Sequence, residues 1–279
     1  MNINSRLSVS VVICAYNEEA HLGRLLRSLT RQTLSCLEVI VVDDGSTDST
    51  ASVAERQASA RLIRQAHRGP AVGRNMGALS AQGEIIVFLD GDMECAPEFI
   101  ERLTAPISRG DSVGTFTRDI YVANPHNRWA AAYAVMRQLR GGRLLPKDFP
   151  DEWDNFRAIR RDVFSSVGGY DDVGYGEDRT LGRKLGIMAT VAPGAVCFHH
   201  NPDSLSEIFA NGRWIGRGAQ IRELESPWRD HLPHRVARWI AHDVRDIPLA
   251  LALLARAGYH GGVLLGLAES TLRPERHWK

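Results

Sequence analysis

The chain has 279 residues, of which 24% are charged and 44% are hydrophobic, and its formal net charge is +1. This length supports one large domain or two small ones. The near-neutral charge gives no reason to expect a nucleic-acid partner. The four cysteines are widely spaced without a CxxC pair, which excludes a dense disulfide framework and suits a reducing compartment. The N-terminal apolar stretch is too short for a signal peptide, so we expect a cytoplasmic protein.

The first ninety residues alternate aliphatic, β-branched runs with segments whose apolar residues recur at helical spacing. Runs of the first kind are typical of buried parallel strands. Strands alternating with helices predict a doubly wound α/β domain, in which ligands bind beyond the carboxyl ends of the strands. The predicted strands are 7–15, 37–42, 61–65 and 83–89, and the predicted helices are 20–30, 49–59 and 72–81.

Polar residues follow the predicted strands at this edge of the sheet, and two of them lie in the octapeptide VFLDGDME. Asp90 and Asp92 are separated there by Gly91 alone. Like charges this close raise each other's pKa unless a cation lies between them. Mg²⁺ and Mn²⁺ prefer oxygen ligands and often use one or two carboxylates together with substrate phosphates. The pattern therefore indicates either a solvated turn or a divalent-cation site.

The pattern becomes looser after residue 111. Residues 124–153 predict a long insertion packed over the edge of the sheet. Regular structure returns at 155–164, with a helix at 180–185 and short strands at 187–192 and 195–199.

The stretch SVVICAYNEEAHLGRLLRSLTRQTLSCLEVIVVDDGSTDST resembles the opening of a family 2 glycosyltransferase of the GT-A fold. GRNMGALSAQGEIIVFLDGDME and FRAIRRDVFSSVGGYDDVGYGEDRTLGRKL continue the resemblance in the same order, up to about residue 200. The resemblance implies a mixed α/β GT-A sheet flanked by helices over residues 1–225. The nucleotide-sugar half would cover about 1–110 and the acceptor half about 111–225, with a C-terminal helical segment at 226–279.

The same resemblance implies an inverting, metal-dependent enzyme. It would move one sugar from a nucleoside diphosphate sugar to the hydroxyl of a sugar, lipid-linked or small-molecule acceptor, in cell-envelope glycan or glycolipid synthesis. Asp43 or Asp44 would accept hydrogen bonds from the base or ribose, and the choice between them is open. The other implied donor contacts are Ala15, Tyr16, Asn17, Glu18, Arg74, Asn75, Asp90 and Gly91.

Three residues match the metal site that the resemblance implies. Asp90 and Asp92 would hold Mn²⁺ or Mg²⁺ against the diphosphate, where the metal stabilises the charge on the leaving group. His199 would complete the site, with His200 as the alternative. Simple turn and capping chemistry is the alternative for the loop at 15–18, and a surface salt bridge is the alternative for Arg74.

The pair Glu177-Asp178 resembles the acceptor-side acidic pair of the family, at a helix start after a glycine-rich loop. A sugar hydroxyl is a poor nucleophile, so Asp178 would take its proton as general base while Glu177 orients the acceptor. The alternative is a helix N-terminus that carries acids because of the helix dipole.

Arg213 and Trp214 match the end of the Gln-x-x-Arg-Trp motif of processive family members, although Ala210 stands at the glutamine position. Arg213 would pair with the diphosphate and Trp214 would stack on a sugar. The missing glutamine favours transfer of a single sugar over polymer synthesis.

Residues 247–268 are long enough to span a bilayer, but Arg256 and His260 interrupt them. Residues 233–246 mix arginine, tryptophan and aliphatic residues at helical spacing, which suits a helix on an anionic membrane surface. Because many members of the family that the chain resembles use lipid-linked acceptors, the resemblance implies a peripheral enzyme on the inner face of the cell membrane. Packing of both helices on the catalytic domain or in a homodimer is the alternative.

Three other functions fit parts of the pattern. A nucleotidyltransferase of related fold would open with a glycine-rich, basic phosphate loop, which residues 15–18 are not. A phosphatase with an aspartyl nucleophile would carry its acidic pair on the first strand. A non-catalytic sugar-nucleotide-binding scaffold would not need Asp90, Asp92 and Asp178 together.

Overall fold

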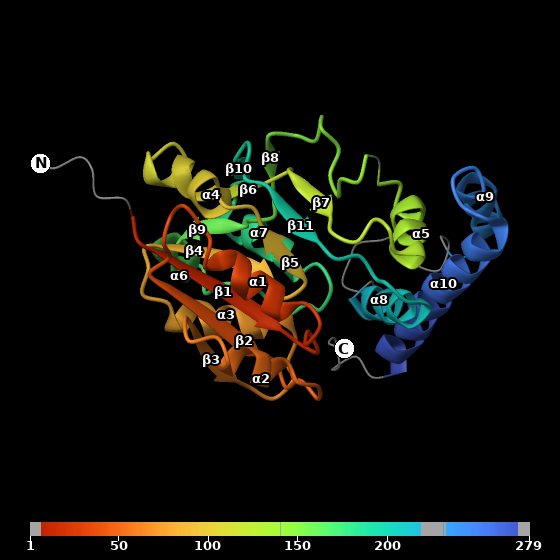
Figure 1. Cartoon of the computed structure of the whole chain (residues 1–279), viewed down its shortest axis with the longest axis horizontal. Coiled ribbons are helices and arrows are strands. Elements are labelled where there is room, and N and C mark those ends of the chain that lie inside the picture. Colours follow the sequence, from red (N-terminus) through yellow and green to blue (C-terminus); the bar gives the residue numbers. More distant parts are fainter. Residues whose placement is uncertain (1–6, 140, 219–230, 232, 273–279) are drawn as a thin grey trace, which may run out of the picture. The chain divides into compact units, whose positions relative to one another are not determined.

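The computed structural model describes residues 7–139, 141–218, 231 and 233–272 (Figure 1). It divides into two compact units, each of which is described by itself. The first unit comprises Met1–Tyr121, Lys147–Asp172 and Glu177–His199, and the second comprises Val122–Pro146, Val173–Gly176 and His200–Lys279. Residues 1–6, on which the signal-peptide expectation partly rests, and the expected boundary at 225 lie outside the described residues.

The first unit is built on an eight-stranded mixed sheet with the strand order β3-β2-β1-β4-β9-β6-β10-β8. The first four strands along the chain are parallel to one another. β9 is antiparallel to both of its neighbours, β4 and β6, and β8 is antiparallel to β10 at the edge. The strands are β1 (Val9–Ala15), β2 (Glu38–Asp43), β3 (Ala60–Arg64), β4 (Ile85–Asp90), β6 (Gly114–Phe116), β8 (Glu152–Trp153), β9 (Ala158–Arg160) and β10 (Ala189–Val191).

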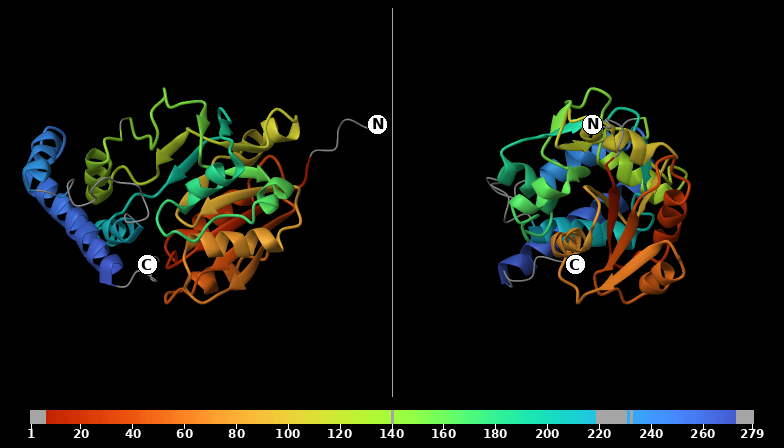
Figure 2. Two further views of the ribbon diagram at one scale, coloured as in Figure 1. Left: turned by 180° about the vertical axis from the view of Figure 1, so that it is seen from behind. Right: turned by 90° about the vertical axis from the view of Figure 1, so that its left-hand side faces the viewer.

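Helices cover both faces of this sheet, because the chain reverses direction along it. The path from β1 to β3 runs one way and the crossover to β4 returns past β1, so right-handed connections put α3 on the face opposite to α1 and α2. The right-hand view of Figure 2 shows the strands edge-on between these layers. The helices of the unit are α1 (Leu22–Leu29), α2 (Thr50–Glu55), α3 (Pro70–Ser80), α4 (Phe99–Ser108), α6 (Arg161–Ser166), the 3₁₀ turn η1 (Glu177–Arg179) and α7 (Thr180–Leu185).

The core of the first unit confirms the sequence expectation of buried parallel strands. Val11, Ile13, Ile40 and Leu89 are each 0% exposed, since helices cover both faces of β1, β2 and β4. The predicted strands and helices of the first ninety residues are all present, although α2 ends at Glu55, earlier than expected. The expected α/β class with a mixed, helix-flanked sheet is therefore confirmed.

A second, three-stranded sheet has the order β5-β11-β7. It consists of β5 (Met93–Cys95), β7 (Ile120–Val122) and β11 (Cys197–His199). β5 pairs antiparallel with β11, and Met93 lies opposite His199. This register places His199 beside the turn that follows β4, where the site residues described below lie.

The segment 124–153, expected as an insertion over the sheet edge, divides between the units. Residues 122–146 belong to the second unit and contain a helix that the sequence reading did not predict, α5 (Arg128–Met136). Asn127 caps this helix, since its Oδ1 accepts hydrogen bonds from the backbone N–H groups of Trp129 and Ala130. Of the rest of the segment, β8 reaches the sheet as an edge strand.

The second unit is helical and consists of α5, α8 (Leu205–Gly218), α9 (Pro233–Asp243) and α10 (Leu249–Leu272). α8 and α10 pack backbone against backbone: a Cβ added at Gly212, Gly216, Gly262 or Gly266 would overlap a backbone oxygen of the other helix. The glycines that interrupt the apolar tail in sequence thus permit close helix packing. Within the described residues, α10 is the one helix long and apolar enough to cross a bilayer by length and composition.

Arg256, the charge that interrupts the apolar tail, lies inside the helical unit. Its side chain is buried, and its Nε donates to Oδ2 of Asp243 at 2.6 Å while Nη2 donates to Oδ1 at 3.0 Å. Asp243 is itself 0% exposed. The bidentate pair satisfies both charges internally, so the arginine does not conflict with the apolar surroundings of α10.

Candidate functional site

The carboxyl ends of three parallel strands meet at one edge of the large sheet. The β1–β2 register places Ala15 opposite Asp43, and the β1–β4 register places Cys14 opposite Asp90. The turn after β4 lies against the loop after β1, since a Cβ on Gly91 would come within 2.8 Å of Cγ of Glu18. The edge that the sequence predicts for ligand binding therefore does gather the acidic residues.

The loop after β1 is held by the loop after β2. Asn17 has a left-handed backbone with φ of 55°. Its N–H donates to Oγ of Ser46 at 2.9 Å, and its Oδ1 accepts from the N–H of Thr47 at 2.9 Å. Next to it, the ring of Tyr16 stacks on His67 with centroids 4.0 Å apart. The two loops form one ordered rim, so capping and turn chemistry accounts for Asn17 in this structure.

Asp43 and Asp44, which the sequence could not tell apart, have different surroundings. Oδ1 of Asp44 accepts from Nε2 of Gln65 at 2.6 Å and from the N–H of Arg68 at 2.9 Å. Oδ2 of Asp44 accepts from the N–H of Gly69 at 2.8 Å and lies 2.8 Å from Nδ1 of His67. Asp44 thus uses both oxygens to hold the loop that leads into α3.

Asp43 makes far fewer contacts. Its Oδ1 accepts from the N–H of Ser46 at 3.2 Å, a bond within its own turn, and the side chain is 5% exposed. Of the two carboxylates, Asp43 is the one that retains an oxygen for a ligand.

Arg74 on α3 bridges two carboxylates from distant parts of the chain. Its Nη2 donates to Oδ1 of Asp90 at 2.7 Å, and its Nη1 donates to Oε1 of Glu177. Burial opposes the charge of Arg74, but Asp90 and Glu177 outweigh it and raise its pKa. The alternative of a surface salt bridge does not hold, because the Arg74 side chain is 11% exposed.

Gly73, the residue before Arg74 on α3, packs directly against β1. A Cβ at this position would overlap Sγ of Cys14 on β1. The cysteine occupies the space that an alanine methyl group would need. The absence of a side chain at Gly73 therefore permits the close contact between α3 and β1 beside Arg74.

Asp90 is clamped from two sides. Besides the bond to Arg74, its Oδ2 accepts from Nη1 of Arg157 at 3.0 Å. Burial favours the neutral acid, but Arg157 and Arg74 together hold the pKa of Asp90 well below its usual range. Both oxygens of Asp90 are thus occupied by guanidinium groups, so this carboxylate is an anchored anion.

Asp92 and His199 form the part of the site that suits a metal ion. His199 Nε2 lies 3.3 Å from Oδ2 of Asp92, as the β5–β11 register requires. Oδ1 of Asp92 and Nδ1 of His199 are buried and have no hydrogen-bond partner within the described residues. No group of three metal-binding side chains was found in the described part of the chain, so a cation here would take its other ligands from substrate and water.

Glu177 and Asp178 lie at the start of η1, as the sequence predicts. Nδ2 of Asn155 donates a hydrogen bond to Oδ2 of Asp178. Burial raises the pKa of Asp178, and the nearby charge of Asp90 adds to this effect against Arg74. Burial likewise raises the pKa of Glu177, and its Oε2 is buried without a partner in the described residues. A carboxylate with a raised pKa is suited to exchange protons near neutral pH.

Asn75, expected as a donor contact, uses its whole amide for the backbone of Tyr170. Its Nδ2 donates to the carbonyl of Tyr170 at 2.8 Å, and its Oδ1 accepts from the Tyr170 N–H at 2.9 Å. This clamp fixes the glycine turn at Gly168 and Gly169, both with positive φ. Both polar groups of Asn75 thus order the segment around Tyr170, and its expected contact with the donor stays a prediction.

Two residues of the site escaped the sequence reading, Asn155 and Arg157. They lie directly before β9, which runs antiparallel to β4, so that Phe88 N–H bonds to the carbonyl of Arg157. The strand therefore starts beside Asp90. The available signal was the alternation of polar residues at i and i+2 in DNFR, which puts both side chains on one face of an extended segment.

Arg213 and Trp214 lie on α8 in the helical unit. Nε of Arg213 donates to Oε2 of Glu269 at 2.9 Å, and Trp214 packs edge-on against Tyr175 with ring centroids 4.9 Å apart. Within their own unit these residues thus join α8 to α10 and to the segment Val173–Gly176. Their expected contacts with diphosphate and sugar stay predictions.

Comparison with known proteins identifies the family. Residues 10–168, more than half of the chain, match the profile of Glycosyl transferase family 2. The chain therefore belongs to this family.

Two curated relatives and one solved structure illustrate the similarity. The chain is 31% identical over 224 residues to the uncharacterized glycosyltransferase EpsJ of Bacillus subtilis, covering 72% of this chain and 63% of the relative. It is 38% identical over 169 residues to undecaprenyl-phosphate 4-deoxy-4-formamido-L-arabinose transferase of Pseudomonas fluorescens, covering 57% and 49%. The chain thus spans less than two thirds of the length of either relative.

The fold is similar to that of the mannosyltransferase PcManGT from Pyrobaculum calidifontis, solved in complex with GDP-Man and Mn²⁺. The TM-score is 0.57 at 20% identity, over 98% of this chain and 89% of the other. This similarity confirms the GT-A fold.

The bridge made by Arg74 predicts a large stability difference between two arginine substitutions. Arg74→Gln leaves the buried carboxylates of Asp90 and Glu177 without their shared cation, and we expect a loss of about 3 kcal/mol in the free energy of unfolding. Arg160→Gln breaks only an exposed pair with Asp162 and should cost less than about 0.5 kcal/mol. Urea unfolding of both variants measures the difference, and equal losses would contradict the bridging role.

Proposed function

We propose that this chain is a metal-dependent, inverting glycosyltransferase that moves one sugar from a nucleoside diphosphate sugar to a hydroxyl acceptor. One observation carries this assignment: Asp92 and His199, which could hold a cation, and the candidate base Asp178 belong to one unit. There Arg74 bonds to Asp90, two positions before Asp92, and to Glu177, the neighbour of Asp178. Membership of Glycosyl transferase family 2 and the GT-A fold support it.

The donor nucleotide would lie over the carboxyl ends of β1 and β2. Asp43 would accept hydrogen bonds from the base or ribose, because both oxygens of Asp44 already accept hydrogen bonds from the loop before α3. The rim formed by Ala15, Tyr16, Asn17 and Glu18 would enclose the base. The complex of PcManGT with GDP-Man supports a nucleotide-sugar donor.

Asp92 and His199 would hold Mn²⁺ or Mg²⁺ against the diphosphate. The donor set fits, since a carboxylate oxygen without a partner and an imidazole nitrogen suit Mn²⁺, and substrate phosphates usually supply further ligands. When bound, the cation would act as a Lewis acid toward the leaving diphosphate. Asp90, held by two arginines, would anchor this side of the site or contact the ribose.

Asp178 would remove the proton from the acceptor hydroxyl as that oxygen attacks the anomeric carbon. Asn155 orients the carboxylate, and burial raises its pKa toward the range in which proton transfer is efficient. Glu177, fixed by Arg74 through one oxygen, keeps the other for the acceptor. A single in-line displacement of this kind inverts the anomeric centre.

The acceptor would be lipid-linked and the pathway one of envelope glycan synthesis. The relative from Pseudomonas fluorescens supports this class, because its name includes undecaprenyl phosphate, a lipid phosphate. The absence of the processive motif's glutamine at Ala210 favours transfer of one sugar. The four free cysteines suit the cytoplasmic face of a membrane.

Helix α10 would rest on the membrane surface. It exposes leucines in its first and last turns, while Arg256 is buried and Glu269 is paired with Arg213 and Arg217. Exposed arginines, Arg238 and Arg245, precede it and would contact anionic head groups. The exposed leucines are Leu249, Leu253, Leu254, Leu264, Leu265 and Leu272.

Asp178→Asn should abolish transfer without weakening donor binding. We expect kcat for release of nucleoside diphosphate from UDP- and GDP-sugars to fall by about 10²- to 10⁴-fold, because the proton acceptor is lost. Nucleotide binding, measured by calorimetry, should be unchanged. Wild-type turnover in a folded Asp178→Asn protein would contradict the role of Asp178 as base, whereas absence of turnover in the wild-type protein would favour a nucleotidyltransferase or a non-catalytic scaffold.

The pH profile gives a second test of the base. Only the ionised carboxylate accepts a proton, so the rate should fall as pH drops through the raised pKa of Asp178, above the usual range of aspartate. Asn155→Ala removes a donor that stabilises the anion, and should move this acid limb to still higher pH. Asn124→Ala, which removes an amide bonded to Asn201 in the helical unit, is the control and should leave the limb in place.

Flotation with anionic vesicles tests the membrane contact. Leu254→Glu puts a charge into the exposed leucine face and should reduce the vesicle-bound fraction several-fold. Leu79→Glu alters an 85% exposed leucine on α3 and should leave binding unchanged. Equal binding of both variants, or a shift from dimer to monomer in Leu254→Glu without vesicles, would assign the face to another use.

A further inference from the structure

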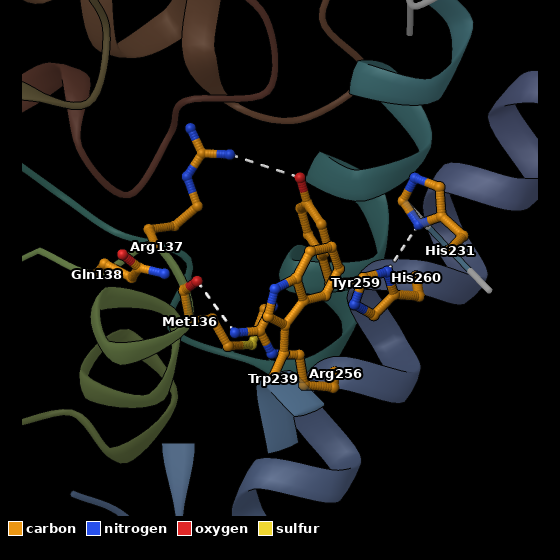
Figure 3. Close-up of a pocket in the computed structure, with 8 residues that line it drawn as sticks. All are labelled: Met136, Arg137, Gln138, His231, Trp239, Arg256, Tyr259 and His260. Carbon is orange, nitrogen blue, oxygen red and sulfur yellow. Dashed lines mark hydrogen bonds between the residues drawn. The ribbon is translucent and has the colours of Figure 1, made fainter. Parts of the chain in front are cut away.

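The helical unit contains a cavity of about 330 Å³, which is within the range of about 300–1,000 Å³ typical of ligand pockets. Side chains at the end of α5 form one side of it, and side chains of α9 and α10 form the other, with His231 at the margin (Figure 3). Its lining residues are Met136, Arg137, Gln138, His231, Trp239, Arg256, Tyr259 and His260. None of the residues assigned to glycosyl transfer lines it.

The charge balance of the cavity favours an anionic ligand. The lining includes two guanidinium groups and no carboxylate. Arg256 is neutralised by Asp243, which approaches it with both oxygens. Arg137 is exposed, and in the described part of the chain it has only phenol partners: its Nη1 lies 3.5 Å from Oη of Tyr259, and it also bonds to Tyr175. The charge of Arg137 is thus left for a ligand to balance.

His260 supplies an independent sign of a missing partner. The residue is 5% exposed, and its Nε2 is buried without a hydrogen-bond partner within the described residues. Its Nδ1 lies 2.7 Å from Nδ1 of His231. Burial, with help from His231 and Arg256, lowers the pKa of His260 to about 4, so the ring is neutral at neutral pH. When His231 donates across this contact, His260 accepts at Nδ1 and carries its own proton on Nε2. That N–H can donate a hydrogen bond to a ligand oxygen.

The aromatic and apolar side chains that line the rest of the cavity favour a ligand that carries an organic part besides its anionic group. The indole of Trp239 lies parallel to the ring of His260, with centroids 5.3 Å apart and an interplanar angle of 10°. Tyr259 and Met136 add ring and thioether surface. Flat aromatic walls beside a guanidinium group suit a ring or alkyl chain attached to the anion.

We propose that this cavity binds a phosphate monoester. The phosphate would be held by the planar fork of Arg137, which can donate two parallel hydrogen bonds to it, and an ester or ring oxygen would accept from His260. The organic part would lie against Trp239 and Tyr259. The same chemistry occurs in soluble sugar phosphates and in lipids with a monoester head group.

Calorimetry with the full-length chain tests the proposal and separates the two sources. The probes are glucose 1-phosphate, inorganic phosphate, and phosphatidylcholine vesicles with or without phosphatidic acid. We expect saturable binding of glucose 1-phosphate or of the phosphatidic acid vesicles, and weaker binding of inorganic phosphate because it lacks the organic part. Absence of saturable binding in both monoester arms would overturn the proposal.

Variants locate the binding. Arg137→Gln should weaken it at least tenfold, whereas Arg128→Gln removes the same charge from an exposed position at the other end of α5 and should leave it unchanged. Equal affinities of these two variants, with equal thermal stability, would overturn the proposal. Asp178→Asn should bind the probe normally, so failure here would be distinct from failure of the glycosyltransferase assignment.

Discussion

The site depends above all on one guanidinium group. Arg74 reaches from α3 to Asp90 at the end of β4 and to Glu177 at the start of η1, two carboxylates 87 positions apart in the chain. Without it, these acids would repel each other and Asp178 across a half-buried space. With it, Asp90 stays charged and Glu177 is fixed, so the end of β4 and the start of η1 are held in one geometry.

The register of the strands places the site residues that Arg74 does not contact. The parallel pairing of β1, β2 and β4 brings Asp43 and Asp90 to the same edge. The antiparallel pairing of β5 with β11 adds His199 beside Asp92. Backbone hydrogen bonds thus place the proposed cation ligands, and their side chains need not hold one another. Among the described residues, one Asp92 oxygen has no hydrogen-bond partner, which suits a site completed by a cation and substrate.

Much of this arrangement could be predicted from the sequence, because its first half is locally encoded. Buried β-branched runs followed by polar turns give the strands, and the turns give Asp43, Asp44, Asp90 and Asp92. The choice of Asp43 as the proposed ligand could not be predicted, since it depends on the segment 65–69, which uses both oxygens of Asp44.

The contribution of the second half of the chain was harder to predict, because its residues reach the site through pairing of strands that are far apart in the sequence. Asn155 and Arg157 matter only because β9 inserts antiparallel beside β4, and nothing in the short segment before β9 specifies that neighbour. The resemblance already favoured His199 over His200, but the physical reason, its position opposite Met93, comes from the pairing of β5 with β11. The glycines of α10 read as interruptions of an apolar run, whereas they serve contacts with α8.

The most direct test of the central claim is a thermal-shift measurement of metal-assisted nucleotide binding. Wild-type protein and Asp92→Asn would be heated with UDP, GDP or dTDP, each with and without MnCl₂. A ligand that binds only the folded state raises Tm. We predict an Mn²⁺-dependent rise for one nucleotide in the wild type and its loss in Asp92→Asn. No rise with any nucleotide, or an equal Mn²⁺-dependent rise in the variant, would contradict the account.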